Sequence, residues 1–128
     1  MANILLVDDD QAVLKSVRMV VNADGHVVQA LDDSLAARDF LAGQEPLDLL
    51  ITDIRMPGLN GLELIEKALT LRPGLPVMVI SAFLDDETVE ALRDLGCQAY
   101  LSKPFQMDDL LAAIHLMLKT PPMAPTAK

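Results

Sequence analysis

The stretch Leu49-Leu50-Ile51-Thr52-Asp53-Ile54-Arg55-Met56-Pro57 decides how the rest of this chain is interpreted. Its first four residues are apolar or β-branched and follow shortly after Pro46, which is typical of a short buried strand. The proline that ends the stretch cannot continue a strand, so the chain turns there. Residues 47–52 are therefore predicted to form a strand that carries Asp53 at its carboxyl end, the edge where open α/β sheets bind ligands.

Four other apolar segments have the composition of buried strands, and they alternate with segments whose apolar residues recur at helical spacing. The predicted strands cover residues 4–7, 26–30, 47–52, 77–80 and 99–102, and the predicted helices cover residues 11–23, 34–42, 61–71, 85–95 and 108–118. Asp10 and Ser34 are predicted to cap the first two helices. This alternation predicts a parallel sheet with right-handed crossovers and helices on both faces.

The order of the strands does not follow from these periods alone. A flavodoxin-like α/β fold, a doubly wound five-stranded parallel sheet in the order 2-1-3-4-5, is one standard solution. That order would place the first and third strands side by side, and so bring Asp8 and Asp9 next to Asp53. The fourth and fifth strands would deliver Ser81 and Lys103 to the same edge.

The composition narrows the class of protein. The 128 residues are 52% hydrophobic, which fits a single domain over residues 1–119, and residues 120–128 contain three prolines and no periodicity, which predicts a disordered tail or the start of a linker. The net charge of −9 argues against direct nucleic-acid binding. No apolar run approaches the ~20 residues of a membrane span. The single cysteine, Cys97, fits a reducing cytoplasm.

The side chains expected at this edge have the chemistry of a metal and phosphoryl site. Neighbouring carboxylates repel one another unless a cation lies among them, and oxygen-only ligands select a hard ion such as Mg²⁺. A carboxylate beside such an ion can act as a nucleophile toward phosphorus. Lys103 would supply positive charge to the phosphoryl oxygens, and the Ser81 hydroxyl would supply a hydrogen bond.

Over residues 3–118 the chain resembles the receiver domain of bacterial two-component response regulators. The motifs that carry the resemblance are, in chain order, Asp8-Asp9, Asp53 followed by Met56-Pro57 and Gly61, Ser81-Ala82, and Tyr100 before Lys103-Pro104-Phe105. Each motif alone is weak evidence for this family, but the order and spacing of all of them together are specific to it. The resemblance implies a phosphoacceptor signalling domain that receives its phosphoryl group from a sensor histidine kinase or a histidine phosphotransfer protein. Such a domain catalyses only its own phosphotransfer and dephosphorylation.

The resemblance also assigns roles to single residues. The phosphoacceptor is Asp53, and the ligands of Mg²⁺ (or Mn²⁺) are Asp8 through a metal-bound water, Asp9, Asp53 and the backbone carbonyl of Arg55. The phosphoryl group is contacted by Lys103, Ser81 and the backbone of Ala82. Arg55 and Phe83 flank the site and tune hydrolysis, and we expect them to shield the phosphoryl group from water. The Lys103-Pro104 peptide is expected to be cis.

Ser81 and Tyr100 form the switch pair implied by the resemblance. The phosphoryl oxygens would attract the hydroxyl of Ser81, and Tyr100 would turn inward to fill the space left beside Ala82. The face made of the fourth helix, fifth strand and fifth helix would change shape, so that an output domain, a partner or a second copy binds differently. The output is transcriptional only by analogy.

Two other interpretations remain at this point. A haloacid-dehalogenase-like phosphatase would use Asp8 as the nucleophile of an Asp8-Asp9-Asp10 motif, although Ala12 stands where that motif expects Thr or Val and the chain has no room for a cap domain. A degenerate receiver would act as an interaction module that does not depend on phosphorylation. The intact acidic residues, Ser81 and Lys103 argue against this second alternative.

Overall fold

The computed structural model describes residues 2–56, 58–97 and 99–119. The elements are β1 (Asn3–Val7), α1 (Gln11–Ala23), β2 (Val27–Leu31), α2 (Ser34–Ala42), β3 (Leu49–Thr52), α3 (Gly61–Leu71), β4 (Val77–Ser81), α4 (Asp86–Leu95), β5 (Ala99–Ser102) and α5 (Met107–Lys119). The turn predicted at Pro57 and the tail predicted for residues 120–128 lie outside the described residues. Within the described part, no helix is long and apolar enough to cross a membrane.

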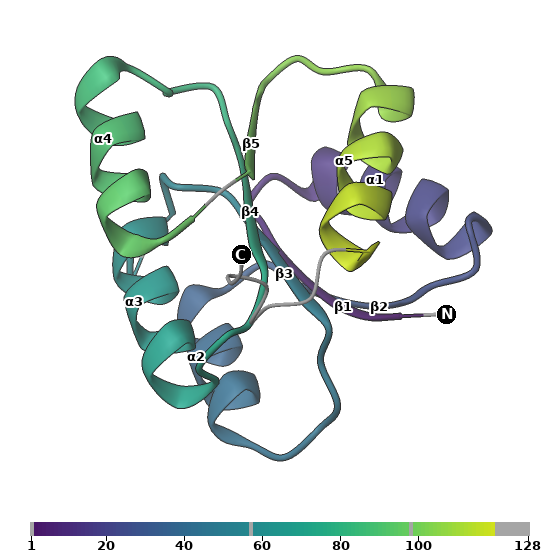
Figure 1. Ribbon diagram of the computed structural model, residues 1–128. Helices are drawn as coiled ribbons and strands as arrows, with labels where there is room; N and C mark the ends of the chain where they lie inside the picture. Colours follow the sequence, from purple (N-terminus) through teal and green to yellow (C-terminus); the bar gives the residue numbers. More distant parts are fainter. Residues whose placement is uncertain (1, 57, 98, 120–128) are drawn as a thin grey trace.

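All neighbouring strands pair in parallel, in the order β2-β1-β3-β4-β5, which confirms the flavodoxin-like prediction. Helices α1 and α5 cover one face of the sheet, and α2, α3 and α4 cover the other (Figure 1). Because side chains alternate along a strand, Leu5 packs in the core under α2 and α3, whereas Leu6 packs in the core under α1 and α5. Burial on both faces explains why the central strands are continuous apolar runs in the sequence.

The helix boundaries follow the predicted capping chemistry with one correction. Asp10 caps α1, because its Oδ1 accepts hydrogen bonds from the backbone N–H groups of Ala12 and Val13. The prediction that Ser34 caps the second helix is wrong. Asp33 is the cap and accepts from the N–H of Leu35 at 2.9 Å, while Ser34 is already helical and fully buried. Both residue types cap helices well, so the sequence alone did not separate them.

Arg72 joins the end of α3 to the loop after α2. Its guanidinium donates to three backbone carbonyls, those of Leu41 at 3.1 Å, Gly43 at 3.1 Å and Glu45 at 2.6 Å. The bonds to Leu41 and Gly43 satisfy carbonyl groups that the C-terminal end of α2 leaves without helical partners, and the bond to Glu45 holds the loop that follows. We expect Arg72→Ala to lower the free energy of unfolding by about 2–3 kcal/mol, measured by urea denaturation.

The matched control for this substitution is Arg38→Ala. Arg38 is a half-exposed arginine on α2 that forms an ion pair with its neighbour Asp39 at 3.5 Å. Exposed pairs of this kind contribute about 0–1 kcal/mol, so the control is expected to lose less than about 1 kcal/mol. Similar losses for the two variants would show that the carbonyl contacts of Arg72 do not stabilise the fold.

Candidate functional site

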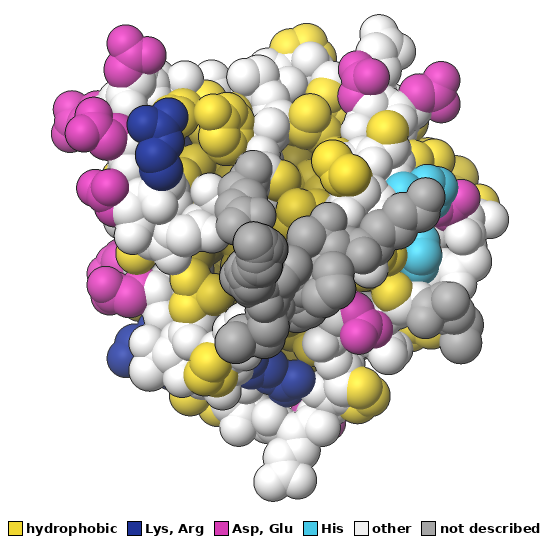
Figure 2. All heavy atoms as spheres, in the orientation of Figure 1, with side chains coloured by type: hydrophobic (Ala, Val, Ile, Leu, Met, Phe, Trp, Pro, Cys, Tyr) yellow, Lys and Arg dark blue, Asp and Glu magenta, His cyan; other side chains and the backbone are white. Residues whose placement is uncertain are grey.

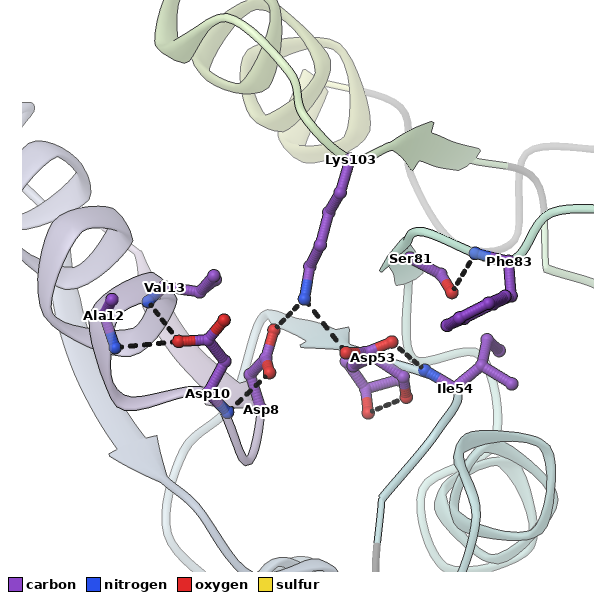
Figure 3. Close-up of polar contacts among 10 residues, drawn as sticks. Asp8, Asp10, Ala12, Val13, Asp53, Ile54, Ser81, Phe83 and Lys103 are labelled. Carbon is purple, nitrogen blue, oxygen red and sulfur yellow. Dashed lines mark hydrogen bonds and ion pairs between the residues drawn. The ribbon is translucent and has the colours of Figure 1, made fainter.

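Three carboxylates, those of Asp8, Asp9 and Asp53, meet where β1 and β3 end, and Figure 3 shows Asp8 and Asp53. Val7 pairs with Thr52 in the sheet, so the residues that follow them, Asp8 and Asp53, lie at the same level, and the N–H of Asp53 donates to the carbonyl of Val7 at 3.0 Å. Carboxylate oxygens of Asp8, Asp9 and Asp53 lie within 4.8 Å of one another. Asp8 and Asp53 are buried, with exposures of 0% and 7%, and Asp9 is exposed.

Lys103 lies between two of these carboxylates. Its Nζ donates to Oδ2 of Asp8 at 2.7 Å and to Oδ2 of Asp53 at 2.9 Å (Figure 3). The residue follows β5, and its backbone N–H donates to the carbonyl of Ser81 at 2.8 Å. Its peptide bond to Pro104 is cis, as the family resemblance implied. The fifth strand therefore delivers its ammonium group to the carboxylates of the first and third strands.

The electrostatics of this cluster leave an excess of negative charge. Burial raises the pKa of Asp8 and outweighs the lowering by the hydrogen bonds from Lys103 and from the N–H of Asp10. Burial alone would lower the pKa of Lys103, but its bonds to Asp8 and Asp53 outweigh that effect and raise the pKa. The lysine is thus a firmly held cation at neutral pH, and this one ammonium faces three carboxylates.

The cluster fits a hard divalent cation. All three side chains offer oxygen, the ligand type that Mg²⁺ and Mn²⁺ prefer. The exposed carboxylate of Asp9 gives an ion an entry path from solvent, and Mg²⁺ commonly keeps several of its waters in protein sites. Arg55, whose backbone carbonyl is the fourth predicted ligand, is exposed in the loop that follows Asp53.

The predicted switch residues lie on β4 and β5, the two strands that follow β3 in the sheet. Ser81 is the last residue of β4 and fully buried, and its Oγ accepts a hydrogen bond from the N–H of Phe83 at 3.0 Å. Ala82, between them, is exposed. Tyr100 pairs with Val79 on the edge strand β5, and 43% of it is exposed. The serine hydroxyl is thus held within its own turn, and the tyrosine lies largely outside the core.

Arg55 and Phe83 form a contact that sequence analysis did not predict. The guanidinium carbon of Arg55 lies 3.9 Å from the centroid of the Phe83 ring, which is a cation–π stack. The stack joins the loop after β3 to the loop after β4. The sequence identified the two residues separately as neighbours of the site, but no local pattern indicates that they touch each other.

Gly61 is a second feature whose physical role was missed. It is the first residue of α3, and its N–H donates to the carbonyl of Ile54 at 2.6 Å. A Cβ on this residue would lie 2.2 Å from the backbone oxygen of Asp53. The start of α3 therefore packs directly against the backbone of Asp53, and only glycine allows that approach.

Comparisons with known proteins agree with this architecture. The family model described as response regulator receiver domain matches residues 4–115. Response regulator MprA of Mycobacterium avium (strain 104) is 36% identical over 116 residues, which cover 91% of this chain and 50% of that protein. This chain thus spans about half the length of the curated relatives that it matches.

Two solved structures are similar over nearly the whole described fold. The CheY-like receiver domain protein from Methanospirillum hungatei JF-1 superposes with a TM-score of 0.89 at 30% identity, over 93% of this chain and 94% of that one. NtrX from Brucella abortus superposes with a TM-score of 0.83 at 31% identity, over 93% of this chain and 27% of that one. With the sheet order, the acidic cluster and the family match in agreement, the chain belongs to the receiver domain family of two-component response regulators.

Proposed function

We propose that this receiver domain accepts a phosphoryl group on Asp53 in a Mg²⁺-dependent reaction. The observation that carries the proposal is how the carboxylate of Asp53 is held. Its Oδ1 accepts from the N–H of Ile54 at 2.6 Å, and its Oδ2 accepts from Lys103 Nζ at 2.9 Å. These two bonds fix the orientation of a buried carboxylate at a sheet edge where two other carboxylates supply metal-binding oxygens.

In the proposed reaction, a carboxylate oxygen of Asp53 attacks the phosphorus of a phosphohistidine or of acetyl phosphate. The new O–P bond forms while the bond from phosphorus to the imidazole nitrogen or acetate oxygen breaks, and the leaving group keeps that electron pair. Lys103 Nζ is already 2.9 Å from Asp53 and compensates the charge that the phosphoryl group adds. The bound Mg²⁺ would supply charge neutralisation at the phosphoryl oxygens. Its ligands would be Asp8, Asp9, Asp53 and the backbone carbonyl of Arg55, with Mn²⁺ as a substitute.

Metal removal tests this proposal. Incubation of the wild type with acetyl phosphate and Mg²⁺ is expected to retard the protein in a phosphate-affinity gel. Addition of excess chelator is expected to remove most of that retarded fraction, because it removes the metal ion. The substitution Asp9→Asn is expected to do the same, because it removes the exposed carboxylate ligand of that ion. Asp10→Asn is the matched control, since asparagine caps a helix as well as aspartate does. Equal retardation with and without chelator would contradict the proposed role of Mg²⁺.

We propose that phosphorylation is transmitted through Ser81 and Tyr100. The Ser81 hydroxyl, now bonded to the N–H of Phe83, would donate to a phosphoryl oxygen instead, and Tyr100 would turn from its exposed position into the space vacated. The chain has one tyrosine and no tryptophan, so its intrinsic fluorescence reports on Tyr100 alone. With acetyl phosphate and Mg²⁺, we expect acrylamide quenching of this fluorescence to decrease.

The switch needs a hydroxyl at position 81, and two variants separate this from an effect of packing. Ser81→Ala is expected to become phosphorylated without any change in quenching, because it cannot bond the phosphoryl oxygen. Ser81→Thr keeps the hydroxyl and is expected to retain the change. A phosphorylated Ser81→Ala variant whose quenching falls as in the wild type would show that Tyr100 moves by another route.

We propose that the stack of Arg55 on Phe83 shields the phosphoryl group from water and prolongs its lifetime. Stacks of this kind contribute about 0.5–1 kcal/mol at exposed sites, so Phe83→Ala is expected to speed loss of the phosphoryl group about two- to fivefold. The measurement is the half-life of the phosphorylated protein after removal of acetyl phosphate. Leu71→Ala, which truncates an exposed apolar residue at the end of α3, is the control. An unchanged half-life in Phe83→Ala would contradict the shielding role.

We propose one kind of partner that supplies the phosphoryl group and another that responds to it. The phosphoryl donor is a sensor histidine kinase or a histidine phosphotransfer protein, and the surface that changes is α4-β5-α5. Through that surface the domain would control an output domain, a separate partner or a phosphorylation-dependent homodimer. The curated relatives are about twice as long as this chain, which supports an attached output domain, and we propose a transcriptional one. We also propose the cytoplasm as its compartment, where the buried thiol of Cys97 stays reduced.

A further inference from the structure

A second cluster of metal-ligating side chains lies at the opposite edge of the sheet from Asp53. Asp24 is the C-cap of α1, His26 directly precedes β2, and His115 is on α5. One ligand atom from each lies within 4.8 Å of the others. Figure 2 shows the histidine side chains, in cyan, on the side of the molecule where α1 and α5 lie. The phosphoacceptor chemistry uses none of these three residues.

The carboxylate of Asp24 is shared between the two imidazoles. Its Oδ2 lies 2.6 Å from Nε2 of His115 and 3.4 Å from Nε2 of His26. The ring centroids are 6.3 Å apart and the ring planes meet at 61°. Both Nε2 atoms therefore converge on one oxygen. Ligand atoms bound to one tetrahedral Zn²⁺ lie roughly 3.3–3.5 Å apart, so the contact between Asp24 and His115 has to open, and half-exposed His115 can move.

The buried Nε2 of His26 is not satisfied by the described side chains around it. The side chain of His26 is only 10% exposed, and its Nε2 has no hydrogen-bond partner among the described residues. A buried polar atom without a partner is uncommon and costly. This atom points into the cluster, toward the carboxylate of Asp24. That carboxylate lies at the negative end of the α1 dipole, where the last turn has no basic residue, so a cation is also favoured there.

We propose that Asp24, His26 and His115 bind a divalent transition metal such as Zn²⁺, with water completing its coordination. Two imidazoles and one carboxylate suit Zn²⁺, whereas Mg²⁺ prefers oxygen alone. The protein would thus bind two chemically different cations at opposite edges of one sheet. A metal at this second site would tie the end of α1 and the start of β2 to α5, a helix of the proposed output face.

Metal binding at this site requires a change of tautomer in His26. Its Nδ1 accepts a hydrogen bond from the N–H of Ala2 at 3.1 Å, so in the neutral ring the proton is on Nε2. A metal bound to Nε2 moves that proton to Nδ1, and the N–H of Ala2 then loses its acceptor. The backbone amide of Ala2 therefore reports directly on whether His26 is a ligand.

The test is a zinc titration of the untagged, metal-free full chain, against a chromogenic zinc indicator and with excess Mg²⁺ to occupy the acidic cluster. One Zn²⁺ per chain is expected. His115→Gln, a substitution on an exposed helix surface, and Asp24→Asn are each expected to weaken binding by about tenfold or more. Asp39→Asn, an exposed carboxylate elsewhere, is expected to bind like the wild type. Far-UV circular dichroism checks that each variant is folded.

Nuclear magnetic resonance supplies the second readout. Zinc is expected to shift the amide resonance of Ala2 in the wild type and to leave it unchanged in His115→Gln at the same zinc concentration. Equal affinity of the wild type and His115→Gln would overturn the proposal. So would stoichiometric zinc binding that is lost in Asp9→Asn but kept in Asp24→Asn, because that result would place the zinc in the acidic cluster instead.

Discussion

Replacing Gly61 with alanine is expected to lower the free energy of unfolding by about 3 kcal/mol or more. The added Cβ would lie 2.2 Å from the backbone oxygen of Asp53 and 2.6 Å from the Cα of Ile54. These are backbone atoms of a buried segment, so they cannot move aside as the end of a flexible side chain can. The start of α3 would have to separate from the end of β3. Urea denaturation of the wild type and the variant measures the loss.

Gly25→Ala is the control that separates this clash from the ordinary cost of replacing glycine. Gly25 has a φ of 96°, and a Cβ there would meet nothing within 4 Å. Its substitution therefore costs only the left-handed conformation, about 1–2 kcal/mol. If Gly61→Ala loses no more free energy of unfolding than Gly25→Ala, then the start of α3 does not pack against the backbone of Asp53 as closely as described.

Replacing Lys103 with methionine is expected to lower the free energy of unfolding by about 3 kcal/mol at neutral pH in the presence of chelator. The substitution leaves the carboxylates of Asp8 and Asp53 buried without their ammonium partner. Lys67→Met, on the exposed surface of α3, is the control and is expected to have little effect. Urea denaturation at a series of pH values is the measurement.

The pH dependence of this loss has a definite sign. Burial already raises the pKa of Asp8 in the wild type, and removal of the hydrogen bond from Lys103, which lowers that pKa, raises it further. The ionised form of Asp8 therefore destabilises the folded variant above that pKa, and the penalty disappears as the carboxyl takes up a proton. The difference between wild type and variant should narrow as the pH falls from neutral toward about 4. A difference that stays constant or grows over this range would contradict this origin.

Much of the fold could be predicted because a parallel sheet covered on both faces has a plain sequence pattern. Each of β1, β3 and β4 contains an unbroken run of apolar residues, and the helices between them have a single apolar face. The cap of α2 was misplaced by one residue, since Asp33 and Ser34 are both good capping residues. The strand order came from a standard solution for this class of sheet and not from the periodicity itself.

The composition of the site was predictable for a related reason. Asp8, Asp53 and Lys103 each follow a strand directly, and parallel strands end at one edge, so the topology alone brings these three residues together. The stack of Arg55 on Phe83 was not predictable, because it depends on how two loops fold toward each other. The same is true of the cluster around Asp24, which joins residues far apart in the sequence.

Whether Asp53 is the phosphoacceptor is decided by the intact mass of the full chain after incubation with acetyl phosphate and Mg²⁺. The wild type is expected to gain the mass of one phosphoryl group, and Asp53→Asn and a chelator-treated wild type are expected to gain none. A wild type that gains nothing under conditions that label an authentic receiver would identify a degenerate interaction module. A gain that persists in Asp53→Asn would contradict this role of Asp53 and point to another nucleophile, with Asp8 as the first candidate.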